Sequence, residues 1–218
     1  MKKLEAVIFD MDGVIIDSEP IHYQVNKELY DELEIEVTDD EYNNFIGVSN
    51  LDHWNYLKER YNIAESVEEL IARQTNQNIE HLQGFSEEPI IGVMQLLEDL
   101  ELENIRIGLA SSSSLRYIKS VLEKFGIDDY FSVMVSGEDV ERGKPHPDIF
   151  QETARKLKVD PENCVVIEDS QNGVRAAKEA QMKCVGFLNE NSGNQDLSLA
   201  DKLVDSMKKV TVDMLKKL

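Results

Sequence analysis

The sequence feature that most constrains the fold is a series of short apolar runs that alternate with helical patterns. Within each run the apolar residues occupy consecutive positions, as in strands covered on both faces. Strands that alternate with helices predict an α/β fold, with a Rossmann-like parallel sheet and helices on both of its faces. The predicted strands are Leu4–Asp10, Ile105–Ser111, Phe131–Gly137, Asn163–Asp169, Lys183–Asn189 and a weaker one that begins at Lys202. The predicted helices between them begin at Pro89, at Leu115 (ending before Gly126), at Pro147 and at Gly173.

One stretch of the chain departs from this alternation. Between Ser18 and about Gly84 the apolar residues follow helical spacing, and no strand pattern occurs. About 65 residues of helix are far more than a connection between two strands requires. The sequence therefore predicts a small helical cap domain over residues 18–84, inserted into a core formed by residues 1–17 and 85–218. The apolar stripes of this cap are Val25 with Leu29, Trp54 with Leu57 and Tyr61, Leu70 with Ile71, and Ile79 with Leu82.

The composition limits the partners that the chain can bind. Of its 218 residues 41% are hydrophobic, the formal net charge is -20, and the pI is about 4.5. Such a surface repels nucleic acids and anionic membranes, so neither is an expected partner. A phosphate ester would bind only where a cation or a lysine offsets this charge. With no membrane span and no signal-peptide pattern, the expectation is a cytoplasmic protein, by default a monomer, with Cys164 and Cys184 reduced.

Two carboxylates follow the first predicted strand. Asp10 and Asp12 are separated by Met11, so both side chains can project from the strand end toward one site. Gly13 allows the chain to turn sharply after them. Two carboxylates this close need a cation or a shared proton. The alternative interpretation is a polar strand end followed by a turn, where Asp and Gly are common.

Polar side chains also follow the next three strands. Ser111 offers a hydroxyl to a phosphate at a helix N-terminus, whereas Ser114 suits an ordinary helix cap. Lys144, between a Gly and a Pro, suits the neutralisation of a phosphate or carboxylate, with a solvated loop lysine as the alternative. Glu168 and Asp169 end the fourth strand, where buried acids need a partner such as Mg²⁺. Ligands of open α/β sheets bind beyond the carboxyl ends of the strands, so one shared site is expected.

Four motifs, in this order, resemble those of the haloacid dehalogenase superfamily. FDMDGVIIDSE is similar to its first motif, LASSS to its second, GKPHPDIF to its third and VVIEDSQNG to its fourth. The resemblance covers nearly the whole chain, because the helical insertion resembles the small cap of this superfamily. More narrowly, the chain resembles the β-phosphoglucomutase-type branch. The resemblance implies a phosphohydrolase that depends on Mg²⁺ and acts on a small phosphate ester.

The resemblance also implies roles for the residues that match its motifs. Asp10 would attack phosphorus and form an aspartyl phosphate, while Asp12 would protonate the leaving oxygen and later activate water. Ser111 and Lys144 would hold the phosphoryl oxygens, and Lys144 would also steady Asp10. The implied Mg²⁺ ligands are Asp10, Asp12 through its backbone carbonyl, Glu168 and Asp169. The residues expected to line the substrate pocket are Gly13, Ser18, His22, Gly47, Asn50, Ser112 and Ser113.

The branch that the chain resembles contains mutases as well as phosphatases, and the sequence favours a phosphatase. In the mutases a cap arginine follows Gly-Val-Ser, and a Lys-Asn pair follows the serines of the second motif. Here Asn50 follows Gly47-Val48-Ser49, and Ser114 and Leu115 take the place of the Lys-Asn pair. The residues that would bind a second phosphate in a mutase are therefore not all present. A proton donor also favours phosphate esters over haloacids, because an alkoxide leaving group needs a proton.

The roles of three further residues stay open at the level of sequence. His22 matches the hinge of the mutases and either influences the proton donor or lies on a helix surface. His53 and Arg60 are candidates to supply the positive charge that the cap arginine provides in the mutases and that Asn50 does not provide here. A binding module that kept the fold and lost the chemistry is a further alternative. Such a module should lack Asp10 or Asp169, and both are present.

Overall fold

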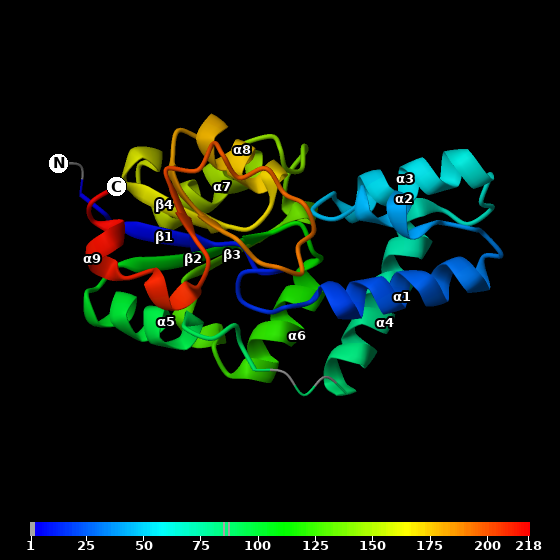
Figure 1. Cartoon of the computed structure of the whole chain (residues 1–218), viewed down its shortest axis with the longest axis horizontal. Helices are drawn as coiled ribbons and strands as arrows, with labels where there is room; N and C mark the ends of the chain where they lie inside the picture. Colours follow the sequence, from blue (N-terminus) through cyan, green and yellow to red (C-terminus); the bar gives the residue numbers. More distant parts are fainter. Residues whose placement is uncertain (1–2, 85, 87) are drawn as a thin grey trace.

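A computed structural model describes residues 3–84, 86 and 88–218 of the chain. Its centre is a parallel six-stranded sheet with the strand order β3-β2-β1-β4-β5-β6 (Figure 1). Each strand lies within a predicted run, and the weak sixth strand is present. The sequence-based prediction of an α/β fold is therefore confirmed. The strands are β1 Ala6–Phe9, β2 Arg106–Ser111, β3 Val133–Ser136, β4 Cys164–Glu168, β5 Lys183–Phe187 and β6 Lys202–Val204.

The central strand β1 explains why the apolar runs are continuous. Successive side chains of a strand point to opposite faces of the sheet. Val7 and Phe9 belong to one apolar cluster, and Ala6 and Ile8 belong to another, and all four are fully buried. Both faces of the sheet are thus covered, and the register that pairs β1 with β2 and β4 brings three strand ends together.

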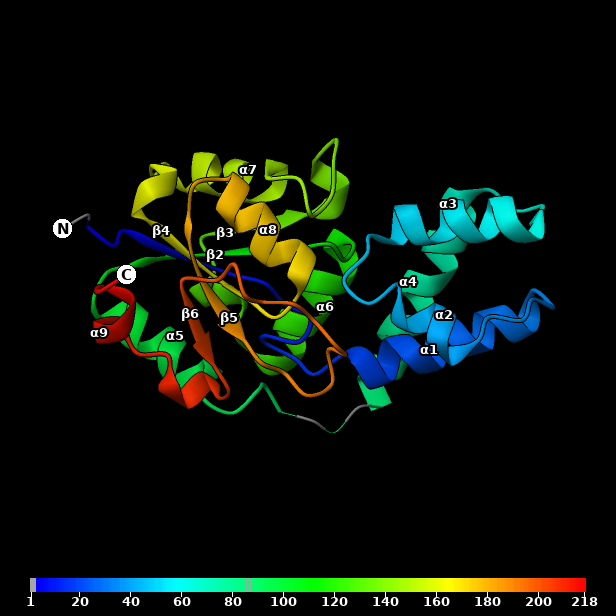
Figure 2. The same ribbon diagram turned by 45° about the horizontal axis from the view of Figure 1, so that its top comes forward.

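Helices of the core cover the two faces of this sheet. Helices α5 and α6 contribute to the cluster of Val7 and Phe9, whereas α7 and α8 contribute to the other cluster (Figures 1 and 2). The core helices are α5 Val93–Leu102, α6 Leu115–Phe125, α7 Asp148–Leu157, α8 Gln171–Glu179 and α9 Val212–Leu215. Short 3-10 turns lie at η1 Asp128–Tyr130, η2 Gly137–Asp139, η3 Pro161–Asn163 and η4 Met207–Lys209.

The predicted start of one core helix is wrong. Helix α5 begins at Val93 and not at Pro89. Gly92 has a φ of 109°, which a helix cannot continue through, and the N–H of Ile90 donates to the carbonyl of Ile15 at 2.8 Å. The stretch before α5 is therefore held by a contact with the core. The predicted end of α6 is confirmed, because Gly126 caps it with a φ of 63°.

Four helices lie beyond the carboxyl ends of the strands and pack on one another (Figures 1 and 2). They are α1 Glu19–Glu32, α2 Asp39–Asn43, α3 Asn50–Tyr61 and α4 Val67–Gly84, and no described residue of 18–84 lies in a strand. Two predicted stripes, Leu70 with Ile71 and Ile79 with Leu82, belong to the single helix α4, and α2 was not predicted. We propose that these helices form the cap. Residue 85, where the core is predicted to resume, and residues 1–2 lie outside the described residues.

Two smaller expectations can be compared with the structure. Cys164 and Cys184 are buried free thiols, as expected. No helix in the described part of the chain has the length and apolar character that crossing a membrane requires.

Candidate active site

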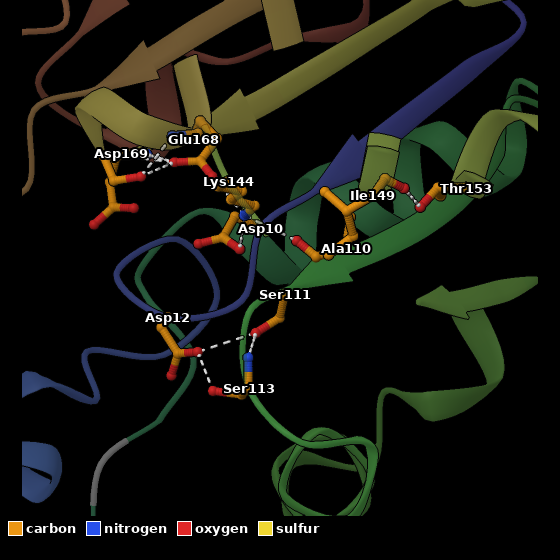
Figure 3. A network of polar contacts seen from close by, with 12 residues as sticks. Asp10, Asp12, Ala110, Ser111, Ser113, Lys144, Ile149, Thr153, Glu168 and Asp169 are labelled. Atoms are coloured by element: carbon orange, nitrogen blue, oxygen red, sulfur yellow. Dashed lines mark hydrogen bonds and ion pairs between the residues drawn. The ribbon is translucent and has the colours of Figure 1, made fainter. Parts of the chain in front are cut away.

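The centre of the site is the ammonium group of Lys144, which lies between three strand ends (Figure 3). Its Nζ donates to Asp10 Oδ1 at 2.7 Å, to Glu168 Oε1 at 2.6 Å and to the carbonyl of Ala110 at 3.1 Å. Asp10 follows β1, Ala110 lies in β2, and Glu168 ends β4. Burial alone would lower the pKa of Lys144, but the charges of Asp10 and Glu168 outweigh burial and raise it. The lysine is thus held as a buried cation.

Three buried carboxylates gather around this cation. One oxygen each from Asp10, Glu168 and Asp169 lie within 4.8 Å of one another. Burial and the charge of Glu168 raise the pKa of Asp10, whereas the charge of Lys144 and its hydrogen bond lower it. Three carboxylates and one ammonium group leave two negative charges when all are ionised. A divalent cation balances that charge, and an all-oxygen donor set fits Mg²⁺.

The carboxylate of Glu168 is fixed by the protein itself. Its Oε1 accepts from Lys144, while its Oε2 accepts from the N–H groups of Asp169 and Ser170, at 3.0 and 2.9 Å, and from the Ser170 hydroxyl at 2.9 Å. A Cβ at Gly173 would lie 1.7 Å from Oε1, so glycine provides the space for this carboxylate. Among the described residues, Asp10 and Asp169 each accept only one side-chain hydrogen bond. They are better placed than Glu168 to offer oxygens to a cation.

The turn after β1 packs directly on Asp169. Gly13 has a φ of 75°, and a Cβ there would lie 1.9 Å from Asp169 Oδ2. The same oxygen accepts a hydrogen bond from the Ser192 hydroxyl, and Asn189 Nδ2 donates to the carbonyl of Gly13 at 2.9 Å. The sequence reasoning missed both Ser192 and Asn189. Asn189 ends the fifth apolar run, which is the same signal that identified Ser111, whereas Ser192 lies in a loop without a pattern.

Asp12 is surrounded by hydrogen-bond donors. Its Oδ1 interacts with the Ser18 hydroxyl at 2.6 Å and with His22 Nε2 at 3.0 Å. Its Oδ2 accepts from the hydroxyls of Ser111 at 3.1 Å and Ser113 at 2.8 Å (Figure 3). Burial would raise the pKa of Asp12, but the hydrogen bond and charge of His22, with Ser18 and Ser113, lower it to about 2. The carboxyl is therefore ionised at neutral pH and paired with His22, whose pKa these contacts raise against burial.

A cavity between the core and helices α1 to α4 joins these groups. The seven residues predicted to line a substrate pocket all line this cavity, which Asp10, Asp12, Lys144 and Asp169 also reach. Ser111 and Glu168 lie behind its wall and contact the lining residues Asp12 and Lys144. Ser114 Oγ accepts from the N–H of Tyr117 at 3.3 Å, so Ser114 caps α6 as expected. The pocket-lining residues are Gly13, Ser18, His22, Gly47, Asn50, Ser112 and Ser113.

Neither His53 nor Arg60, the two candidates to replace the cap arginine of the mutases, brings a positive charge into this cavity. His53 is buried between aromatic rings, with Phe45 at 4.3 Å and Trp54 at 5.1 Å between ring centroids. Its Nε2 pairs with the Tyr30 hydroxyl at 2.8 Å, and burial lowers the pKa of His53 to about 3, so the ring is neutral. Arg60 does not line the cavity; its guanidinium donates to the Tyr56 hydroxyl at 2.7 Å.

The neutral state of His53 predicts how stability depends on pH. Its pKa is 6.5 in the unfolded chain and about 3 in the folded protein, so the unfolded chain binds one more proton between these values. Stability therefore falls as the pH is lowered through this window. We expect His53 to account for a loss of about 2 kcal/mol between about pH 6.5 and about pH 5. Urea unfolding of His53→Gln should lack this part of the pH dependence, and equal slopes for both proteins would contradict a buried neutral ring.

Comparisons with known proteins identify the family of the chain. The sequence model of the haloacid dehalogenase-like hydrolase family matches residues 7–187. A phosphorylated carbohydrates phosphatase of Thermotoga maritima is 36% identical over 179 residues, which cover 81% of this chain and 82% of that protein. Hexitol phosphatase B of Escherichia coli is 32% identical over 219 residues, or 96% of each protein. The crystal structure of β-phosphoglucomutase from Clostridium difficile, 30% identical, has a TM-score of 0.87 and covers 98% of this chain and 96% of its own. The chain therefore belongs to the haloacid dehalogenase-like hydrolase family, in its β-phosphoglucomutase-like branch.

Proposed function

We propose that the protein is a Mg²⁺-dependent phosphatase that hydrolyses small phosphorylated metabolites of the sugar-phosphate type through an aspartyl phosphate on Asp10. It is a phosphoric monoester hydrolase, as the names of its phosphatase relatives support. The observation that carries the proposal is the ion pair between Lys144 and Asp10 at 2.7 Å, beside Asp169 and at the floor of a cavity that also exposes Asp12. We further propose that it acts as a monomer in the cytoplasm.

The carboxylate cluster suits the cation that this chemistry requires. Asp10, Asp169 and the backbone carbonyl of Asp12 would hold Mg²⁺, with Glu168 as a further candidate whose oxygens already anchor Lys144. When bound, the ion would supply positive charge that lets a carboxylate approach a phosphate dianion. The ammonium group of Lys144 is a second cationic group beside Asp10. In a protein with a net charge of -20, this local positive charge is what makes phosphate binding favourable.

The side chains of this chain account for both halves of the reaction. An oxygen of Asp10 forms a bond to phosphorus as the bond to the leaving oxygen breaks, while Lys144, which lines the cavity, holds the transferring phosphoryl group. The expected role of Ser111 on the same oxygens requires its hydroxyl, which now donates to Asp12 at 3.1 Å behind the cavity wall, to turn toward the phosphoryl group. Asp12 delivers to the leaving alkoxide a proton that it receives from protonated His22, whose Nε2 lies 3.0 Å from Asp12 Oδ1. In the second half, Asp12 takes a proton from water, which attacks phosphorus and frees Asp10. His22, at 3.0 Å from Asp12, shares a proton with it and so prepares this carboxyl for both directions of transfer.

A phosphatase is favoured over a mutase by the charges in the cavity. A mutase must hold a second phosphate while the sugar turns over. Lys144 is the only lysine or arginine among the described residues that line the cavity, and it is bound to Asp10 and Glu168. Asn50 lines the cavity where the mutases carry an arginine. No further lysine or arginine in the described lining is available to bind a second phosphate.

The discriminating experiment follows the fate of β-glucose 1-phosphate in the presence of Mg²⁺ and a glucose 1,6-bisphosphate primer. We expect free phosphate and no accumulation of glucose 6-phosphate, and we expect EDTA to stop the release of phosphate. Formation of glucose 6-phosphate would assign the protein to the mutases. If neither product forms, p-nitrophenyl phosphate and a panel of sugar phosphates should be tested next. Inertness toward all of them would favour a binding module on the same fold.

A further inference from the structure

We propose that the cap end of the cavity selects phosphate esters whose alcohol is uncharged and rich in hydroxyl groups, and that Glu19 is the residue that rejects a second anion. This inference rests on the proposed phosphatase function. It assigns a specificity-determining role to a side chain that belongs to neither the cation cluster nor the group around Lys144.

The walls of the cap end carry neutral amide groups. Asn26 of α1 and Gln74 of α4 line the cavity, and both are buried. Gln74 Oε1 accepts from Trp54 Nε1 at 2.9 Å, and Gln74 Nε2 donates to Asn26 Oδ1 at 2.8 Å. This chain of hydrogen bonds fixes the orientation of both amides. Fixed neutral amides suit the hydroxyl groups of a sugar or polyol, because each hydroxyl can donate and accept.

One carboxylate stands among these amides. Glu19 begins α1 and lines the cavity, where its Oε1 accepts a hydrogen bond from the Tyr42 hydroxyl at 2.7 Å. Burial raises the pKa of Glu19, and the charge of His22 and the hydrogen bond from Tyr42 oppose that rise. Tyr42 also lines the cavity, as do the amides of Asn26 and Gln74. Glu19 can accept hydrogen bonds from the hydroxyl groups of an uncharged substrate.

The only positive charge that acts on Glu19 from the described lining is that of His22, which is already paired with Asp12. Lys144 is the only lysine or arginine in the described lining, and its ammonium group is held at the opposite end by Asp10 and Glu168. His53 is neutral, and His22 is paired with Asp12. In a partly buried site, two like charges a few ångströms apart repel by enough to change an equilibrium about tenfold or more. A second phosphate or a carboxylate on the substrate is therefore disfavoured.

The test compares two substrates that differ only in the charge at one carbon. Glucitol 6-phosphate carries a primary alcohol where 6-phosphogluconate carries a carboxylate. With Mg²⁺, we expect kcat/KM of the wild type for glucitol 6-phosphate to exceed that for 6-phosphogluconate by about tenfold or more. Glu19→Gln, which keeps the size of the side chain and an acceptor for Tyr42, should shrink this ratio by about tenfold, mainly by raising kcat/KM for 6-phosphogluconate. Tyr42→Phe, which releases Glu19, should shrink it less.

The matched control is Glu59→Gln, which removes the same charge from an exposed position on α3 and should leave the ratio unchanged. Equal rates of the wild type on both esters, or an unchanged ratio in Glu19→Gln, would overturn the selectivity. A shift of the same size in Glu59→Gln would also overturn it, because the effect would then come from net charge. Hydrolysis of p-nitrophenyl phosphate distinguishes the two levels of failure. If p-nitrophenyl phosphate is hydrolysed but the ratio of the two kcat/KM values differs from the expected one, only this inference fails. If no ester releases phosphate, the proposed function fails as well.

Discussion

Replacement of Asp10 by Asn is expected to lower the release of phosphate from p-nitrophenyl phosphate by at least about 10³-fold. The amide keeps the shape of the side chain but is a poor nucleophile toward phosphorus. It also removes one of the two carboxylates that are best placed to offer oxygens to Mg²⁺. The loss should therefore appear in kcat at saturating Mg²⁺, and no excess of substrate should restore it.

The same variant should remain folded, which separates chemistry from stability. Lys144 keeps Glu168 and the carbonyl of Ala110 as partners when Asp10 becomes an amide. Its melting temperature and circular dichroism should stay close to those of the wild type. The control is Asp129→Asn, which removes a carboxylate from an exposed 3-10 turn and should keep full activity. If Asp10→Asn were folded and retained a tenth of the wild-type kcat, Asp10 would not be the nucleophile.

The fold and the centre of the site could be predicted from the sequence for one shared reason. Parallel strands covered on both faces must be apolar throughout, so a polar residue marks the point where each strand ends. Asp10, Ser111 and Glu168 stand at such points, and the register of β1 with β2 and β4 places them side by side. Lys144 lies several residues beyond β3, so its place between Gly143 and Pro145 indicated only a defined cation, and the resemblance to a motif implied its contact with Asp10.

The cap could be predicted less well, because its interior is polar. Helix α4 reads as two short apolar stripes, since Gln74, Thr75 and Asn78 in its middle are buried polar residues. The spacing of apolar residues, which is used to predict the buried face of a helix, is interrupted at those positions. Gln74 lines the cavity, and Asn78 Oδ1 lies 3.4 Å from Nδ1 of the lining residue His22. Two of the polar residues that obscured the helix are therefore at or beside the proposed ligand site. Where His53 and Arg60 point depends on packing with aromatic neighbours, which spacing does not encode.

Replacement of Lys144 by Met is expected to have the largest effect on stability. The variant leaves Asp10 and Glu168 facing each other in a buried site without the ammonium group that now lies 2.7 and 2.6 Å from them. Removing one partner of a buried ion pair costs about 3–5 kcal/mol, which urea unfolding would measure. Phosphate release should fall by at least about 10²-fold even where the protein is folded, because the positive charge on the phosphoryl oxygens is lost.

Mg²⁺ should restore part of the stability of Lys144→Met, since a divalent cation binds the same carboxylates and offsets the lost charge. The rise in melting temperature with added Mg²⁺ should therefore be larger for this variant than for the wild type. Lys119→Met, which removes an exposed ammonium group from α6, is the matched control and should behave like the wild type. A Lys144→Met variant as stable as the wild type in EDTA would mean that Asp10 and Glu168 are not both charged in the folded protein. The electrostatic basis proposed for the site would then be wrong.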